Sequence, residues 1–224
     1  ILASNVFAHS DNLQEMAECM FKLLDKKGTI IIEVQYLLNT LKDLTFDNIY
    51  HEHYNYWSLT SLNNFFNRLN ARIYRSERID THGGSIRVVV QKKNGPKPVS
   101  DSVRNLINIE LKLGLNTIDP ILSLSNKIKE LNEKLNSLVH DIKNEGLQLI
   151  GYGAPAKATT LLYEFELSDQ IDYIIDDNPL KQGLYTPGSH IPVVNADVLR
   201  QEIVPEYMII LAWNFAEQIM ENND

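Results

Sequence analysis

The chain has 224 residues, of which 44% are hydrophobic and 22% charged, a composition typical of a soluble globular protein with one large or two small domains. The net charge of −8 and the pI near 5.3 argue against a protein that binds nucleic acid through phosphate contacts. The single cysteine, Cys19, excludes an internal disulfide framework and fits a cytoplasmic protein, and the absence of a long apolar run excludes a membrane-spanning helix.

The first hundred residues predict alternating helices and strands that close on an antiparallel hairpin. Helices are predicted where apolar side chains recur at helical spacing, over residues 13–24 and 58–70. Strands are predicted from runs of apolar and β-branched residues at 1–8, 29–34, 71–77 and 85–91. Ser58 or Thr60 could cap the second helix. This order of elements is similar to the later half of a class I methyltransferase sheet, a likeness of fold alone.

Residues 92–100 are rich in lysine, proline and glycine and read as a linker between a domain at 1–94 and a domain at 101–224. The second domain is expected to begin with two helices, at 101–113 and from Asp119 to about residue 142. The apolar side chains of the longer helix step by three and four over about three heptads. That seam could pack against the chain's own sheet or form a coiled coil between subunits, so the oligomeric state stays open.

The remainder predicts a second α/β unit with short connections, typical of a parallel, right-handed layered sheet. Its strands are expected at 147–150, 171–175 and 207–213. Its helices are expected at 157–165, at 198–203 and after Asn214, which could cap the last one.

Residues 48–56 combine three tyrosines, two histidines and a glutamate between two apolar segments. In an extended backbone His51 and His53 share one face, with Glu52 on the other. Histidine titrates near neutrality, and a neighbouring carboxylate or phenol can orient it, so this stretch suits general acid–base catalysis. It could also be a polar aromatic turn that pins a helix to a sheet. A third possibility is a metal site, but nothing nearby completes a ligand shell, and we predict no metal.

A glycine pattern, Gly151-Tyr152-Gly153-Ala154-Pro155-Ala156, follows a predicted strand and opens a predicted helix. It fits the dinucleotide fingerprint, with Asp176 or Asp177 near where a ribose ligand is sought. Its backbone N–H groups and Lys157 could hold a pyrophosphate, although Pro155 lacks one of the donors. A structural turn without a ligand explains the pattern equally simply. The pair Gly83-Gly84 is similarly ambiguous between a tight hairpin and close approach to a ligand.

Six motifs in one order carry a family resemblance over nearly the whole chain. They are Asn5-Val6-Phe7-Ala8-His9, Tyr50-His51-Glu52-His53, His82-Gly83-Gly84-Ser85, Gly151 to Lys157, Asp177 to Gly183 with its continuation to Pro192, and Leu211-Ala212-Trp213-Asn214-Phe215-Ala216. This set resembles the sugar C-methyltransferases, which use S-adenosylmethionine to methylate nucleotide-linked keto-sugars in deoxysugar biosynthesis.

The resemblance implies an α/β protein made of the second half of a class I methyltransferase (Rossmann-like) sheet, followed by a second Rossmann-like α/β domain. Members of the family also carry an N-terminal zinc-binding domain, whose cysteines are absent here, as are the first strand and glycine-rich loop for S-adenosylmethionine. Because the chain starts at Ile1 without a methionine, we expect a fragment or a remnant of a longer enzyme. Zinc would then belong to the missing part, and the S-adenosylmethionine site would be incomplete.

The resemblance also implies roles for individual residues. His53 would be the base that removes the proton beside the sugar ketone, with Tyr50 and Glu52 near the sugar's polar groups and His9 at the end of the preceding strand. Asn5 would lie where that strand meets the methyl donor. The sugar nucleotide would be bound by residues from two turns, namely His82, Gly83, Gly84, Ser85, Gly151, Tyr152, Gly153 and Lys157.

Two other functions stay open on the sequence. The chain could be a non-enzymatic nucleotide or nucleotide-sugar binding module without a complete site for the methyl donor. It could also be an NAD-dependent enzyme that uses the Gly151 turn and Asp177. The sequence specifies neither the sugar, the nucleotide nor the carbon that is methylated.

Overall fold

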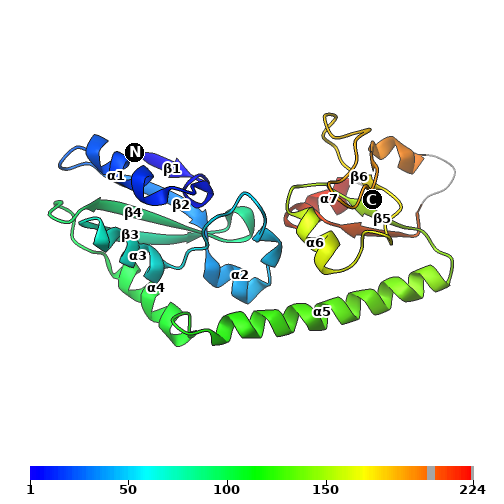
Figure 1. The fold of residues 1–224 in the computed structure, drawn as a ribbon, viewed down its shortest axis with the longest axis horizontal. Coiled ribbons are helices and arrows are strands. Elements are labelled where there is room, and N and C mark those ends of the chain that lie inside the picture. Colours follow the sequence, from blue (N-terminus) through cyan, green and yellow to red (C-terminus); the bar gives the residue numbers. More distant parts are fainter. Residues whose placement is uncertain (201–204, 223–224) are drawn as a thin grey trace. The chain divides into compact units, whose positions relative to one another are not determined.

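The computed structural model describes residues 1–200 and 205–222, and the chain forms two compact units (Figure 1). The first unit comprises Ile1–Phe46 and His51–Ser125. The second comprises the short segment Asp47–Tyr50 and the chain from Asn126 onward. The units therefore divide after Ser125, later than the division at 94/101 expected from the linker.

The first unit contains one mixed four-stranded sheet in the order β1-β2-β4-β3. Its strands are β1 (Leu2–Ser4), β2 (Ile30–Gln35), β3 (Ala71–Ile79) and β4 (Ser85–Lys92). β1 runs parallel to β2, whereas β4 is antiparallel to both β2 and β3. The predicted strands and hairpin are confirmed, and the arrangement matches the predicted later half of a class I methyltransferase sheet.

Helices complete the first unit. They are α1 (Leu13–Leu23), α2 (Leu37–Asp43), α3 (Leu59–Arg68) and α4 (Asp101–Lys112), with 3-10 turns at Phe7–His9, Phe46–Asn48 and Thr81–Gly83. Ser58 caps α3 in a reciprocal capping box with Ser61, as one of the two predicted caps. The sequence pattern did not predict α2, whose inward face includes the polar side chains of Asn39 and Thr40.

Helix α4 explains where the first unit ends. Its residues Val103 and Leu106 are buried in the same core as the strands of the first sheet. The segment before α4 is also fixed, because the Arg72 guanidinium donates to the carbonyls of Gly95 and Lys97. Residues 92–100 therefore return α4 to its own sheet, and no domain boundary falls there.

The second unit contains a parallel four-stranded sheet in the order β7-β6-β5-β8, as its short connections predicted. Its strands are β5 (Leu149–Tyr152), β6 (Ile174–Ile175), β7 (Val193–Val194) and β8 (Tyr207–Ile210). The long helix α5 (Asp119–Asn144) enters the unit, followed by α6 (Ala158–Glu164), 3-10 turns at Ala196–Arg200 and Trp213–Phe215, and α7 (Ala216–Asn222). The helix predicted at 198–203 begins as a 3-10 turn, and its remainder lies outside the described residues.

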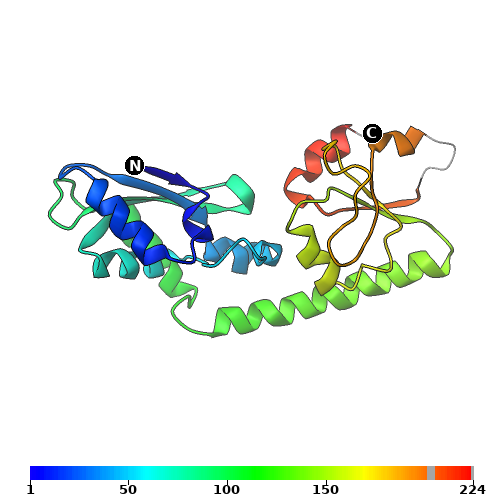
Figure 2. The same ribbon diagram turned by 45° about the horizontal axis from the view of Figure 1, so that its top comes forward.

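Alternating side chains of β5 divide the second unit into two apolar cores. Leu149 packs with Val139 of α5 and Leu162 of α6, whereas Ile150 on the opposite face packs with Ile219 of α7. Figure 2 shows α5 and α6 on one side of this sheet and α7 on the other. The sheet is thus covered on both faces, as expected for parallel strands.

The apolar seam of α5 is covered only in part. Val139 and Ile142 pack in a core of the second unit, whereas Leu138 is 54% exposed and Leu131 is 37% exposed. Packing against the chain's own sheet therefore accounts for the C-terminal part of the seam. Within the described residues, no helix is both long enough and apolar enough to cross a bilayer.

Candidate functional site

Residues 51–56, here called the histidine stretch, lie along the carboxyl ends of the parallel strands β1 and β2. The Tyr54 N–H donates to the Ala8 carbonyl at 3.0 Å, just beyond β1. Three residues later, the Trp57 carbonyl accepts from the N–H of Leu37, just beyond β2, at 2.9 Å. Ligands of open α/β sheets bind at this end of the strands. The backbone contacts place the predicted catalytic residues where such a site is expected.

Two predicted imidazoles lie against each other at this position. The ring centroids of His9 and His53 are 5.0 Å apart and their planes are tilted by 44°. His53 is buried, with 8% of its surface exposed, whereas His9 is exposed. The Tyr56 hydroxyl donates to the His53 carbonyl at 3.2 Å, and the two rings meet edge to face. His53 is thus held in a fixed surrounding of aromatic groups next to an accessible histidine.

Glu33, near the end of β2, connects two further predicted motifs. Its carbonyl accepts from the Asn5 N–H at 3.0 Å, and its carboxylate accepts from the Thr81 hydroxyl at 3.2 Å. Arg87 also pairs with this carboxylate at 2.9 Å. Asn5, the 81–85 turn and the histidine stretch are therefore all attached to the carboxyl ends of β1 and β2.

Packing explains Gly84, one of the two adjacent glycines in the 81–85 turn. At Gly84, with a φ of +108°, an added Cβ would lie 2.4 Å from the side chain of Asn39. Ser85 is fully buried and donates its hydroxyl to the Thr81 carbonyl, which closes the turn. His82 is exposed in the left-handed region with a φ of 52°. Of the predicted residues His82 to Ser85, only His82 is exposed.

The other predicted residues belong to the second unit. Tyr50 is half-buried in the segment Asp47–Tyr50, whereas Glu52, which follows in the first unit, is exposed. Gly151 and Gly153 have close neighbours, since an added Cβ would lie 2.9 Å from Ile174 and 2.5 Å from Ala212, respectively. Both glycines are therefore explained by packing, as the interpretation without a ligand proposed.

Asp176 accepts from one donor of the glycine turn and from two groups that follow it. Its carboxylate accepts from the Ala154 N–H at 2.7 Å, from the Asn178 N–H at 2.9 Å and from Lys181 Nζ at 3.0 Å. Burial of the carboxyl raises its pKa, but these hydrogen bonds and the Lys181 charge outweigh burial and hold the pKa below its ordinary value. The Tyr152 hydroxyl donates to Asp177 at 2.9 Å. The Ala154 N–H and the Tyr152 hydroxyl thus already have partners within the chain.

Lys157 points to a partner that the sequence did not suggest. Its Nζ lies 3.5 Å from Oδ2 of Asp47 and 4.0 Å from the ring centroid of Trp213. The Trp213 indole N–H donates to the same Asp47 oxygen at 2.6 Å. No local pattern marks Asp47, because its partners lie more than a hundred positions along the chain.

Glu110 is a second residue that sequence reasoning missed. Its carboxylate, on α4, accepts from the Tyr36 hydroxyl at 2.7 Å and from the Thr60 N–H at 2.9 Å at the start of α3. Burial and this hydrogen bond raise the pKa of the Tyr36 hydroxyl. Glu110 follows Val103 and Leu106 at helical spacing, so a charged residue on an apolar helix face was the available signal. Glu110 fixes the start of α3, the helix that follows the histidine stretch.

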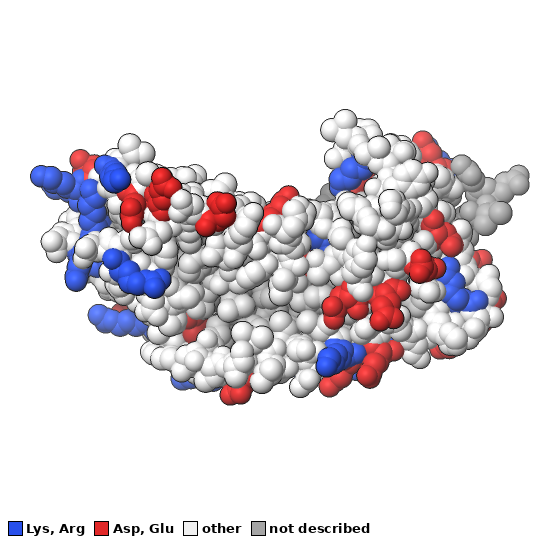
Figure 3. Space-filling view, in the orientation of Figure 1, with Lys and Arg blue, Asp and Glu red and all other residues white. Residues whose placement is uncertain are grey.

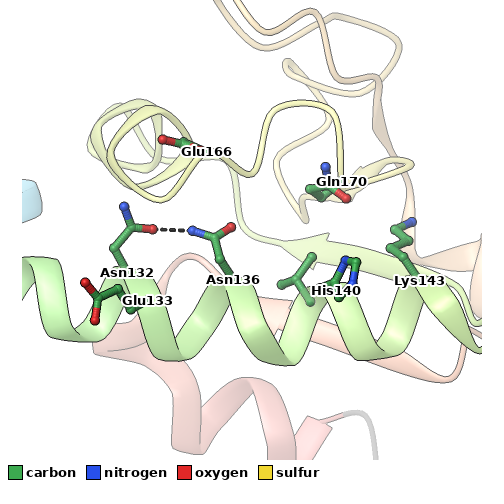
Figure 4. A pocket seen from close by; sticks show the side chains of 8 residues that line it. Asn132, Glu133, Asn136, His140, Lys143, Glu166 and Gln170 are labelled. Atoms are coloured by element: carbon green, nitrogen blue, oxygen red, sulfur yellow. Dashed lines mark hydrogen bonds between the residues drawn. The ribbon is translucent and has the colours of Figure 1, made fainter.

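Two hollows lie away from all the predicted residues. One, of about 450 Å³ in the second unit, is lined by α5 side chains and by Glu166 and Gln170 (Figure 4). The other, of about 510 Å³ in the first unit, is lined by Phe21, Leu69 and several lysines and asparagines. In the parts of the chain that the structure describes, no three His, Cys, Asp or Glu side chains gather closely enough to hold a metal ion.

The surface charge gives no continuous basic band on the face shown in Figure 3. Lys and Arg side chains form separate small groups there, with acidic side chains among them. The distribution agrees with the net charge of −8.

Comparison with known proteins decides the family. The family described as "C-methyltransferase C-terminal domain" matches residues 80–224, well over half of the chain. The chain belongs to the C-methyltransferase family. It is also 33% identical over 217 residues to a protein of Streptomyces niveus named C-methyltransferase NovU. The matched region is 96% of this chain and 51% of NovU, so the chain spans about half the length of that relative.

Proposed function

We propose that the chain carries the acid–base residues of a C-methyltransferase that acts beside the ketone of a nucleotide-linked keto-sugar. The observation that supports this most directly is the convergence of three polar motifs at the carboxyl ends of β1 and β2. Asn5, His53 and the 81–85 turn are each bonded there or in contact with a residue bonded there. Membership of the C-methyltransferase family supplies the reaction type.

In this proposal His53 is the general base. A carbon next to a ketone is acidic enough for a positioned imidazole to remove its proton, which leaves an enolate and an imidazolium. His9, in contact with His53 and exposed, is placed to pass that proton to solvent. Tyr50 and Glu52 hold polar groups of the sugar, and the turn from His82 to Ser85 lines the sugar site. Holding the base against the carbon in the right geometry adds to the rate.

S-adenosylmethionine, when bound, supplies a sulfonium methyl group that accepts the electron pair of the enolate carbon as the carbon–sulfur bond breaks. The residues present fit one side of such a site. Asn5 is half-buried at the end of β1, with a φ of 53° and its N–H bonded to Glu33. β1 lies at the edge of its sheet, and within the described residues only β2 pairs with it. Asn5 is the residue that we assign to the methyl donor.

The base can be tested without the methyl donor, because deprotonation alone exchanges hydrogen with solvent. We expect the protein, with any preceding residues that its gene encodes, to exchange deuterium into a nucleoside-diphosphate-linked keto-deoxyhexose in heavy water. We expect His53→Gln to slow this exchange by roughly 100-fold or more, since a general base contributes about 10²–10⁴-fold. Adding S-adenosylmethionine should then give a methylated sugar, detected by mass spectrometry. No exchange by the wild-type protein, or unchanged exchange by His53→Gln, would contradict the proposal.

A binding module without chemistry is the second candidate. It is favoured by the parallel second sheet, where the glycine turn follows β5 at the carboxyl end of the strand. The contacts of Asp176 and Lys157 count against a phosphate at this turn. Calorimetry with a nucleoside diphosphate separates the candidates: heat of binding without deuterium exchange would favour the module, whereas no heat at millimolar ligand would remove it.

A further inference from the structure

The Lys157 ammonium has two partners in the second unit. Its Nζ lies 3.5 Å from Oδ2 of Asp47 and 4.0 Å from the ring centroid of Trp213. Only 13% of the Lys157 side chain and 2% of the Asp47 side chain are exposed. Because a cation over an indole face is attracted by the ring quadrupole, both contacts restrain the same ammonium group.

The same cluster holds the backbone of the segment Asp47–Tyr50 at two points. The Trp213 indole N–H donates to the Asp47 carboxylate at 2.6 Å, and the Thr160 hydroxyl of α6 donates to the Ile49 carbonyl at 3.1 Å. Tyr50 is the next residue, and His51 follows it directly. The course of the segment Asp47–Tyr50 is therefore fixed by residues of the second unit, namely Thr160 of α6 and Trp213 in the loop after β8.

The burial of the Lys157–Asp47 ion pair suggests that it orients the segment to which Asp47 belongs. Burial lowers the pKa of the Lys157 ammonium, and the attraction of Asp47 restores it only in part. A buried ion pair often contributes less to stability than apolar residues of the same size would, and its geometry is directional. An ammonium retained at such a position is better explained by the geometry that it imposes than by net stability.

We propose that Lys157, Asp47 and Trp213 are positioning residues, which orient Tyr50 by holding the segment Asp47–Tyr50 and do not bind the phosphates of the substrate. The inference rests on the proposed function for its catalytic consequence, whereas its structural part can be tested separately. It replaces the phosphate contact that the sequence suggested for Lys157, and it gives Asp47 and Trp213 a role in holding Tyr50.

The structural part is tested in the full chain by nuclear magnetic resonance and hydrogen exchange. Trp57 is the other tryptophan of the chain, so Trp57→Phe assigns the indole resonance of Trp213. We expect Lys157→Met and Asp47→Asn to shift that resonance and to speed amide exchange of residues 48–51 at least about tenfold. Lys157→Arg, which keeps the charge, should restore part of the protection. Lys143→Met removes another paired lysine of the second unit, whose partner is Asp172, and serves as the matched control.

The catalytic part uses the deuterium-exchange reaction. We expect Lys157→Met to lower kcat/KM about tenfold, because Tyr50, which we propose to hold a polar group of the sugar, loses its orientation. Lys157→Arg should recover activity, and Lys143→Met should resemble the wild type. A raised KM with unchanged amide exchange of residues 48–51 would overturn the proposal in favour of a ligand contact. If the wild type shows no exchange, the proposed function fails, and the resonance still decides whether the cluster orders residues 48–51.

Discussion

Both sheets carry polar residues at the carboxyl ends of parallel strands, but these residues have different partners. In the first unit two imidazoles, His9 and His53, lie in contact at this end of the sheet. In the second unit the carboxylate of Asp176 accepts from the Ala154 N–H of the glycine turn and from Lys181 Nζ. A glycine pattern at a strand end is therefore insufficient evidence of a ligand, because the chain's own side chains can satisfy the donors.

The largest expected effect separates chemistry from stability in the first unit. His53→Gln should reduce deuterium exchange by about 100-fold or more. It should change the free energy of unfolding by less than about 1 kcal/mol, since glutamine fills much of the same space and most substitutions that keep packing have small effects. Urea denaturation of both proteins checks this. A loss of stability large enough to explain the loss of exchange would mean that His53 acts mainly in packing.

The opposite outcome is expected in the second unit. Asp176→Ala removes the acceptor of three donors and should lower the free energy of unfolding by about 4 kcal/mol, the range for removing one partner of a buried pair. Asp177→Ala, at the exposed neighbouring position, should cost under about 1 kcal/mol. Urea denaturation compares the two. Similar losses for both variants would show that the contacts of Asp176 do not stabilise the turn.

Substitutions of two glycines distinguish the cost of backbone strain from the cost of a steric contact. Gly153 and Gly183 have similar φ values, +85° and +79°, but an added Cβ meets Ala212 only at Gly153. Gly183→Ala should cost about 1 kcal/mol from its left-handed backbone, and Gly153→Ala about 3 kcal/mol because steric contact is added. Thermal unfolding measures both. Equal shifts would mean that the contact with Ala212 relaxes freely.

The smallest effect is the dependence of the Asp176 contribution on pH. The folded-state pKa of this carboxyl lies below its unfolded value of about 3.9, so the stabilisation is present above that pH. It is lost as the pH falls through the folded-state pKa. The difference in unfolding free energy between the wild type and Asp176→Asn should therefore shrink on acidification below about pH 4. A difference that is constant from pH 6 to pH 3 would contradict this assignment.

Local sequence patterns predicted most elements but failed where the decisive partner was distant. The spacing of apolar residues over 13–24 and the cap at Ser58 gave α1 and the start of α3. Helix α2 was missed because it is short and buries polar side chains. The linker at 92–100 suggested a domain boundary, yet Val103 and Leu106 of α4 pack on the first sheet. The composition of residues 92–100 does not reveal that the helix after them packs on the sheet before them.

The sequence by itself determined the class of the fold, the order of the polar motifs and the residue types for acid–base chemistry, because these depend on local spacing. Only the tertiary structure decided which motifs meet. It placed His9 against His53, bonded Asp176 into the glycine turn and joined Lys157 and Trp213 to Asp47. The hydrogen bond of Asp176 to the glycine turn joins residues 22 positions apart, and that of Trp213 to Asp47 joins residues 166 positions apart. A pattern of neighbouring residues does not encode such pairings.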